Sequence, residues 1–166
     1  MNTDSQPEKR TFEKVSTFVS FAFIIINIIY LLVQWKELPG QVPIHFNAKG
    51  EADGWGGKGM VWFLPFIAFL LWGVMTALER MPHLYNIPNL TEENKEQLFM
   101  NTRAMLNVMK SEIIIFLVYT SWQSVQWSRG NEAGLGYFEL PVFLIVVFGT
   151  MGVFLYRNYK ISRKRV

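Results

Sequence analysis

The chain has 166 residues and no cysteine, a formal net charge of +3, and a composition that is 51% hydrophobic and 16% aromatic. This length has room for about one domain, and the lack of cysteine excludes disulfides and thiolate metal sites. The cations form no basic stripe and no groove-reading motif, which argues against nucleic acid as a partner.

Four stretches of the chain carry no Asp, Glu, Lys or Arg. They lie between Lys14 and Lys36, between Lys58 and Glu79, between Glu112 and Arg129, and between Glu139 and Arg157. Each holds roughly 16 to 21 residues, close to the roughly 20 that a helix needs to cross a bilayer. The first is too long for a signal peptide and no small-residue cleavage site follows it. The sequence therefore predicts an all-α integral membrane protein with four transmembrane helices.

The basic residues predict how this protein is oriented. With both ends in the cytoplasm, twelve of the Lys and Arg residues lie inside and four lie outside, as the positive-inside rule requires. We therefore expect a multi-pass protein of the cytoplasmic membrane, with the lipid bilayer as its first partner. The expected segments are a cytoplasmic tail (1–14), a two-span domain (15–79) with an extracytoplasmic loop (36–58), a cytoplasmic loop and amphipathic helix (80–111), the third and fourth spans (112–156) and a basic cytoplasmic tail (157–166).

The extracytoplasmic loop is too long and too particular for a bare connector. Its apolar residues Val42, Ile44 and Phe46 alternate with His45 and Asn47, as in an extended strand with one apolar face. The glycines that follow predict a turn and a return limb. We expect a small hairpin-like cap whose polar side chains either bind a ligand or only hydrogen-bond the loop to itself.

Polar residues also occur inside the predicted spans. Asn27 lies near the middle of the first span, and Tyr119, Gln123 and Gln126 follow helical spacing in the third. An amide in hydrocarbon needs a partner, so we expect these four residues to form an intramembrane polar face with Asn27 within reach. Such a face serves either interhelical hydrogen bonding, within the bundle or in a homo-oligomer, or a solute pathway.

The loop and the span after it resemble a bacterial membrane domain of unknown function that opens the SdpI-type immunity proteins. The resemblance covers about residues 18 to 70 and rests on a pattern of Leu-Pro, Ile-Pro-x-His-Phe, Asn, Gly, Pro-Asp and Lys. The matching residues are Leu38, Pro39, Pro43, His45, Phe46, Asn47, Gly50, Asp53 and Lys58, while Ala52 stands where the family usually has proline.

The resemblance implies toxin immunity or envelope signalling, with a peptide toxin or another membrane protein bound through the extracytoplasmic loop. The predicted binding residues are His45, Asn47 and Asp53. A small transporter subunit that uses the polar face of the third span, or a purely structural role, is the alternative. A transporter needs an interior charge, and only Glu112 and Glu139 offer one from the sequence.

Enzyme chemistry is not expected. The only two histidines, His45 and His83, lie on opposite sides of the membrane in this topology, so they cannot share a metal ion. No Ser-His-Asp arrangement, phosphate loop or dinucleotide fingerprint occurs. We therefore predict no cofactor.

Overall fold

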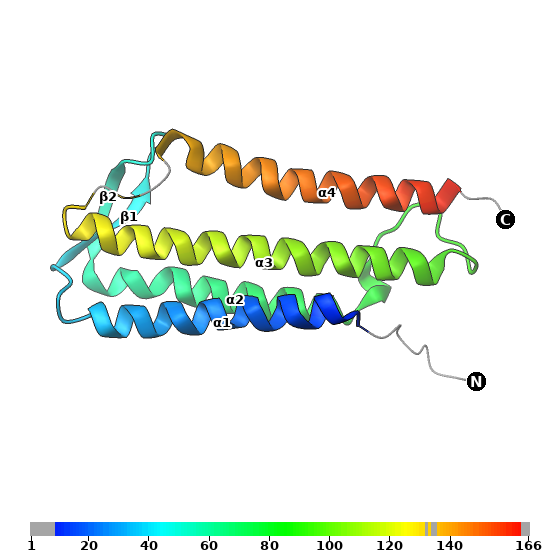
Figure 1. Ribbon diagram of the computed structural model, residues 1–166, viewed down its shortest axis with the longest axis horizontal. Coiled ribbons are helices and arrows are strands. Elements are labelled where there is room, and N and C mark those ends of the chain that lie inside the picture. The colour runs from blue at the N-terminus through cyan, green and yellow to red at the C-terminus, as the bar shows by residue number, and fades with distance from the viewer. Residues whose placement is uncertain (1–8, 132, 134–135, 164–166) are drawn as a thin grey trace.

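The computed structural model describes residues 9–131, 133 and 136–163, and its helices run side by side with a β-hairpin across one end (Figure 1). In chain order the elements are α1 (Thr11–Gln34), β1 (Gln41–Phe46), β2 (Ala52–Gly57), the 3-10 turn η1 (Lys58–Trp62), α2 (Phe63–Leu78), the turn η2 (Pro82–Leu84), α3 (Lys95–Ser128), the turn η3 (Gly136–Phe138) and α4 (Glu139–Arg163). Residues 1–8 of the expected first tail and 164–166 of the last lie outside the described residues.

Four helices are long and apolar enough to cross a membrane: α1, η1 with α2, α3, and η3 with α4. Large apolar side chains such as Phe18, Phe66 and Ile145 are well exposed on three of them, and no described residue of α4 is buried. A helix that carries apolar residues outward as well as inward belongs in lipid. This confirms the predicted four-span, all-α membrane protein.

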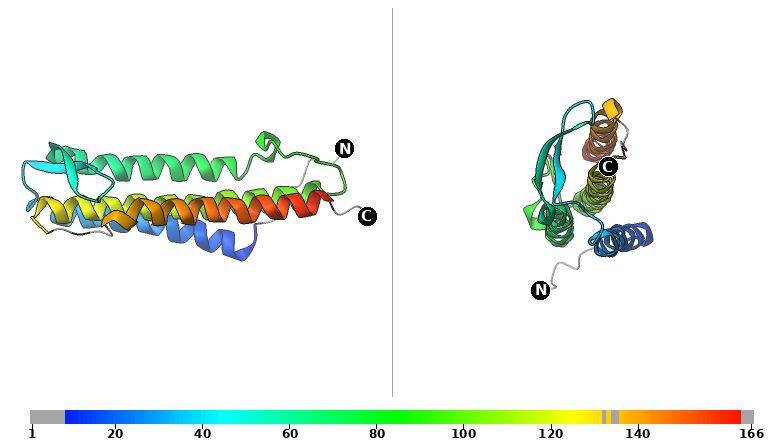
Figure 2. Two further views of the ribbon diagram at one scale, coloured as in Figure 1. Left: turned by 90° about the horizontal axis from the view of Figure 1, so that it is seen from above. Right: turned by 90° about the vertical axis from the view of Figure 1, so that its left-hand side faces the viewer.

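The helix α3 is the centre of the bundle. It packs against α1, α2 and α4, whereas α1 and α2 pack against each other, and the end-on view shows α4 on the opposite side of α3 from α1 and α2 (Figure 2). Two small apolar clusters hold the first three helices together, one of Ile24, Ala68 and Ile114, the other around Leu31 and Val125.

The expected amphipathic segment and the third span form one continuous helix. α3 runs from Lys95 to Ser128, and 34 residues at about 1.5 Å each give roughly 50 Å, more than the roughly 30 Å hydrocarbon layer. Its first turns do not lie flat on a surface, because they pack between the other helices. There Asn101 Nδ2 donates to Phe154 O at 2.9 Å and to Asn158 Oδ1 at 2.8 Å.

The predicted cap is a two-stranded antiparallel hairpin. The predicted strict alternation of buried and exposed side chains is wrong, however, because the strand register shifts around Ile44. As a result, Val42 and Pro43 are both buried and Ile44 is 51% exposed. A bulge of this kind re-aims side chains locally. At the turn, Asn47 Oδ1 accepts from the backbone N–H groups of Lys49 at 2.8 Å and of Glu51 at 3.1 Å.

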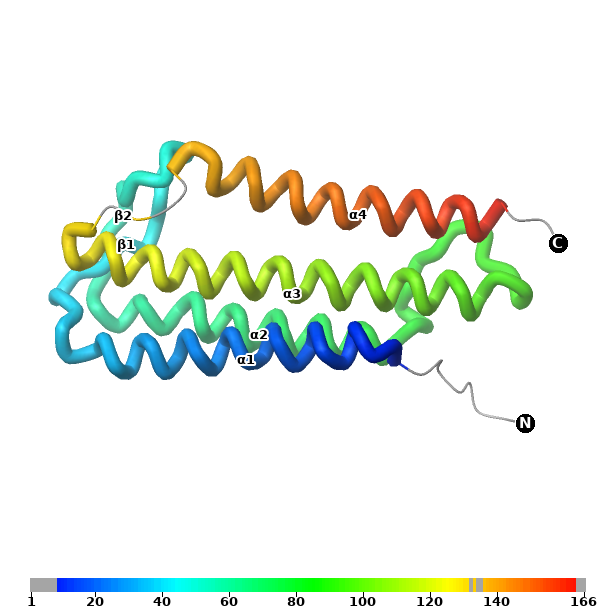
Figure 3. The backbone as a smooth tube through the Cα atoms, in the orientation of Figure 1, coloured from blue at the N-terminus to red at the C-terminus, as the bar shows by residue number. Residues whose placement is uncertain are grey.

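The smooth backbone trace shows that α1 begins and α4 ends at the same end of the bundle, while the hairpin lies at the opposite end (Figure 3). We call the first the terminal end and the second the cap end. Both described ends of the chain therefore lie at the same end, as an even number of spans requires. Which end faces the cytoplasm stays a prediction from the basic residues.

Thiol labelling tests that orientation directly, because the chain has no cysteine. Single cysteines introduced at Ala48 and Ala133, at the cap end, should react with an impermeant thiol reagent in intact cells. Cysteines introduced at Asn94 and Ser162, at the terminal end, should react only after lysis. Labelling at Ser162 in intact cells would contradict the orientation.

Candidate cap-end binding cavity

A cavity of about 550 Å³ lies at the cap end between the hairpin and three helices. Its walls come from the hairpin, from η1 and the start of α2, from one face of α3, and from η3 and the start of α4. Outside α3, the lining residues are 43–48, 50, 60, 61, 63, 64, 136, 139 and 140. The lining is mainly apolar. Cavities of roughly 300 to 1,000 Å³ with apolar walls and few polar groups are typical of small-molecule sites.

The α3 wall consists of Phe116, Thr120, Ser121 and Ser124. Helical spacing puts these residues on neighbouring rows of one face, and the three small hydroxyl residues leave space that larger side chains would fill. Below them, the Phe116 ring stacks on Phe143 of α4 with centroids 3.9 Å apart. Space is therefore left at the cap end, where α3 carries small residues beside α4.

Two of the three hydroxyl groups on this wall donate a hydrogen bond to a backbone carbonyl. Thr120 Oγ1 donates to Phe116 O at 3.0 Å, and Ser124 Oγ donates to Pro43 O at 2.7 Å, which also ties the hairpin to α3. Ser121 is only 2% exposed, and its Oγ has no hydrogen-bond partner among the described residues. A buried hydroxyl without a partner costs free energy, and the Ser121 hydroxyl has the capacity to hydrogen-bond a group bound in the cavity.

Glu139 supplies the acidic group of the cavity. It is the first residue of α4 and half-buried, and Gln123 Nε2 donates to its Oε2 at 2.9 Å. Gln123 is fully buried and its Oε1 has no partner among the described residues. In the described part of the chain, no ion pair involves Glu139, and no Lys or Arg lines the cavity.

The predicted loop residues lie at the hairpin wall. His45 and Asn47 line the cavity. Asp53 does not line it, and its Oδ1 pairs with His45 Nδ1 at 2.5 Å. Both of these side chains are exposed, at 70% and 45%. Asn47 holds the turn, and its Nδ2 donates to Glu51 Oε2 at 2.9 Å. The three residues therefore hydrogen-bond the loop to itself, and two of them also face the cavity.

The predicted polar face divides into separate environments. Gln123 reaches the cavity through Glu139, while Tyr119 packs its ring against Trp122 at 5.9 Å and Gln126 is half-buried near the end of α3. Asn27 is buried, and its Oδ1 lacks a partner among the described residues. Neither Tyr119, Gln126 nor Asn27 lines the cavity.

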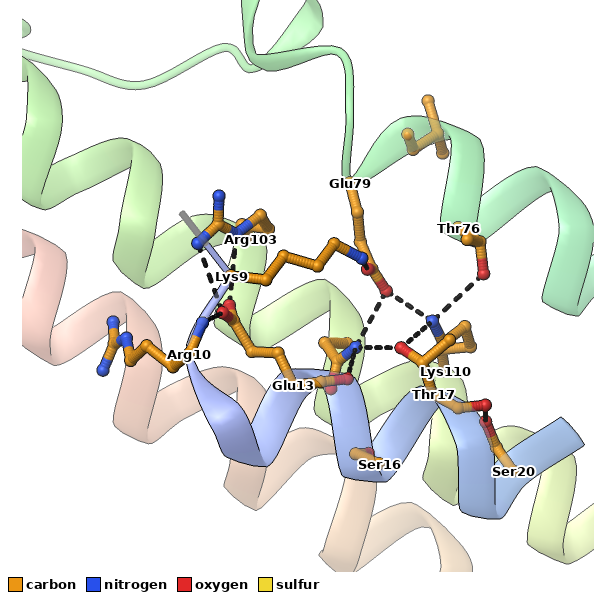
Figure 4. Close-up of polar contacts among 12 residues, drawn as sticks. Lys9, Arg10, Glu13, Ser16, Thr17, Ser20, Thr76, Glu79, Arg103 and Lys110 are labelled. Carbon is orange, nitrogen blue, oxygen red and sulfur yellow. Dashed lines mark hydrogen bonds and ion pairs between the residues drawn. The ribbon is translucent and has the colours of Figure 1, made fainter. Parts of the chain in front are cut away.

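The sequence reasoning missed a second polar assembly, at the terminal end (Figure 4). This ionic cluster consists of Lys9, Glu13, Glu79, Arg103, Asn107 and Lys110. Lys110 Nζ pairs with Glu79 Oε1 at 2.6 Å and Arg103 pairs with Glu13 at 3.2 Å, all four side chains being nearly or fully buried. The sequence did contain a signal for this cluster, because Arg103, Asn107 and Lys110 are spaced by four and three residues and so share one face of a helix.

Neighbouring groups complete the ionic cluster. Asn107 Nδ2 donates to Glu79 Oε1 at 3.1 Å and to the Thr17 hydroxyl at 2.8 Å, so it joins α1, α2 and α3. Tyr85, in the loop after α2, donates its hydroxyl to Leu78 O at 3.1 Å. Burial, opposed by Arg103, raises the pKa of Tyr85 to about 12, so the phenol stays a neutral donor at physiological pH.

The fold and the cavity define a four-span membrane protein with a capped site between helices. Residues 22–69 match the family model described as Domain of unknown function (DUF1648), which confirms the predicted resemblance to a domain of unknown function. The matched range runs from α1 through the whole hairpin into α2, and so contains two walls of the cavity. No curated protein and no solved structure matches the chain.

Proposed function

We propose that this chain is a binding protein of the bacterial cytoplasmic membrane that takes an apolar or amphipathic ligand in the cap-end cavity. The role that fits it best is SdpI-like, namely immunity to a secreted peptide toxin or signalling of its presence. The observation that supports this proposal is the cavity itself, which lies between the hairpin and three helices and has a mainly apolar lining with a few polar groups.

The composition of the walls favours a ligand that arrives through the membrane. Ile44, Met60, Phe63 and Leu140 line the cavity and are 42–54% exposed. In a bilayer such side chains border lipid, so an apolar ligand reaches the site without crossing a polar barrier. A membrane-active peptide has the required apolar side chains.

The role proposed is binding without catalysis. His45 is held by Asp53 as in a catalytic pair, but no hydroxyl or thiol is hydrogen-bonded to the His45 ring among the described residues. A nucleophile within hydrogen-bond reach of its base is the basic requirement for covalent catalysis. The His45–Asp53 pair therefore serves to position the hairpin and the ring beside the cavity.

A cavity-filling substitution tests this proposal. Ser121→Phe places an aromatic ring in the cavity, whereas Val146→Phe adds the same bulk to the lipid-exposed face of α4, where Val146 is 45% exposed. In a bacterial host sensitive to a secreted peptide toxin, expression of the intact chain should protect. Val146→Phe should protect equally, and Ser121→Phe should lose most protection at unchanged membrane abundance.

Two further results bear on the same proposal. Asn47→Ala should reduce abundance and protection together because Asn47 holds the turn, while Asp53→Ala should affect protection more than abundance. An intact chain that never protects refutes the immunity role. Full protection by Ser121→Phe would remove the cavity from the mechanism.

A small transporter subunit is the second candidate, and the ionic cluster favours it. Buried charges are what ion-coupled transport requires, and the structure places Glu13, Glu79, Arg103 and Lys110 inside the bundle. Because these charges pair directly with one another, a structural role in holding the helices together is the better interpretation. Ion-dependent solute uptake into proteoliposomes, abolished by Glu79→Gln in folded protein, would favour transport.

A further inference from the structure

We propose that the ligand of the cap-end cavity carries an ammonium group on an apolar stem, and that this group binds at Glu139. The inference rests on the proposed binding function and narrows its ligand to one chemical class. A peptide offers such a group as its N-terminal amine or as a lysine side chain.

The hydrogen-bonding state of the cavity supports a donor-rich ligand. The hydroxyl hydrogens of Thr120 and Ser124 are already given to backbone carbonyls, so both oxygens can only accept. Gln123 does not line the cavity, but one N–H of its Nε2 donates to the Glu139 carboxylate, which does. An ammonium group has three N–H donors and no acceptor, so it complements such a surface.

The charge of the cavity supports a cation. Glu139 contributes a carboxylate, and the described residues that line the cavity include no Lys or Arg to neutralise it. Gln123 occupies Oε2 and holds the carboxyl group in place, while no hydrogen bond to Oε1 is present among the described residues. Charge-assisted hydrogen bonds are roughly twice as strong as neutral ones, and apolar surroundings strengthen them further.

The shape of the cavity supports a stem of some length. A volume of about 550 Å³ is far larger than a single inorganic cation needs. The remaining space is bounded by apolar side chains, chiefly Pro43, Val61, Leu64 and Phe116. An alkyl chain or an apolar side chain would fill it, with the charged end beside Glu139 of α4.

Because the chain has no cysteine, a single introduced thiol can report whether the cavity is occupied. Thr120→Cys puts one thiol on the cavity wall, and Val146→Cys puts one on the lipid-exposed face of α4 as the control. Each variant is reconstituted in zwitterionic nanodiscs and reacted with a membrane-permeant maleimide. The probes are dodecylamine, dodecanol and dodecanoate, which share a chain length and differ in the head group.

Dodecylamine should protect the thiol of Thr120→Cys at a concentration about tenfold or more below that of dodecanol, the size expected for hydrogen bonds to a charged group. Dodecanoate should protect least, and Val146→Cys should show no difference among the probes. Adding Glu139→Gln should reduce the preference for the amine to less than about twofold while dodecanol still protects.

The failures are distinguishable. Equal protection by amine and alcohol, or stronger protection by dodecanoate, overturns the ammonium inference and leaves the cavity as a binding site. No protection by any probe overturns the binding function and the inference together. If Glu139→Gln does not fold, the ratio of amine to alcohol protection in the Thr120→Cys parent decides by itself.

Discussion

Replacing Glu79 by leucine should destabilise the folded protein by about 3–5 kcal/mol, the range measured when one partner of a buried ion pair is removed. Glu79 and Lys110 have fully buried side chains and pair at 2.6 Å. Without the carboxylate, the ammonium of Lys110 keeps the hydroxyls of Thr17 and Thr76, each at 3.1 Å, and the Trp72 ring, whose centroid is 5.8 Å away. Two neutral hydroxyls do not offset the desolvation of a full charge.

The loss should be measured by SDS-induced unfolding in mixed micelles, followed by tryptophan fluorescence. Glu79→Leu combined with Lys110→Met should recover most of the lost stability, because an apolar pair of similar volume often replaces a buried ion pair without cost. Lys110→Met alone should cost less than Glu79→Leu, since Glu79 keeps Lys9 at 2.5 Å. A double variant as unstable as Glu79→Leu would contradict this account.

Gly50→Ala should separate the hairpin from the start of α4 and so disturb the wall of the cavity. Gly50 has a φ of +75°, and an L-residue there costs about 1–2 kcal/mol. A Cβ at this position would lie 2.7 Å from the Cα of Gly136, a backbone atom that cannot yield as a side chain can. The clash adds to the backbone cost, so the total loss should exceed that of the backbone term alone.

Gly57→Ala is the matched control within the same hairpin. Gly57 has a φ of −61°, and a Cβ added there would meet no neighbouring atom within 4 Å, so the change should stay within about 0.5 kcal/mol. Limited proteolysis of the hairpin should accelerate in Gly50→Ala and not in Gly57→Ala. Equal proteolysis of the two variants would mean that the contact of Gly50 with Gly136 does not hold the cap.

The hairpin shows how far local sequence information reached. Asn47 and Gly50 predict a turn because an Asn side chain caps its own backbone and glycine tolerates positive φ, and both do so here. The face of each strand residue was less predictable. Ile44 became exposed because the ladder bulges beside it, and a bulge depends on how β2 pairs, which alternation in β1 does not encode.

The candidate site was predictable only in part. His45 and Asn47 were selected by their place in a compact loop, and both line the cavity. Glu139 was seen only as a charge at the edge of a span, since nothing in the sequence places it beside Gln123, which lies 16 positions earlier on another helix. Ser121 was not predictable as a site residue, because small hydroxyl residues are common in membrane helices.

The sequence by itself determined that the chain is a four-span membrane protein, because hydropathy and charge act on each segment separately and the bilayer selects segments by length. Tertiary structure alone decided which polar groups meet. Glu13, Glu79, Arg103 and Lys110 all read as interfacial charges along the chain, yet helix packing buries them as two ion pairs. Partners in different helices are chosen by the three-dimensional register of those helices, which no single segment specifies.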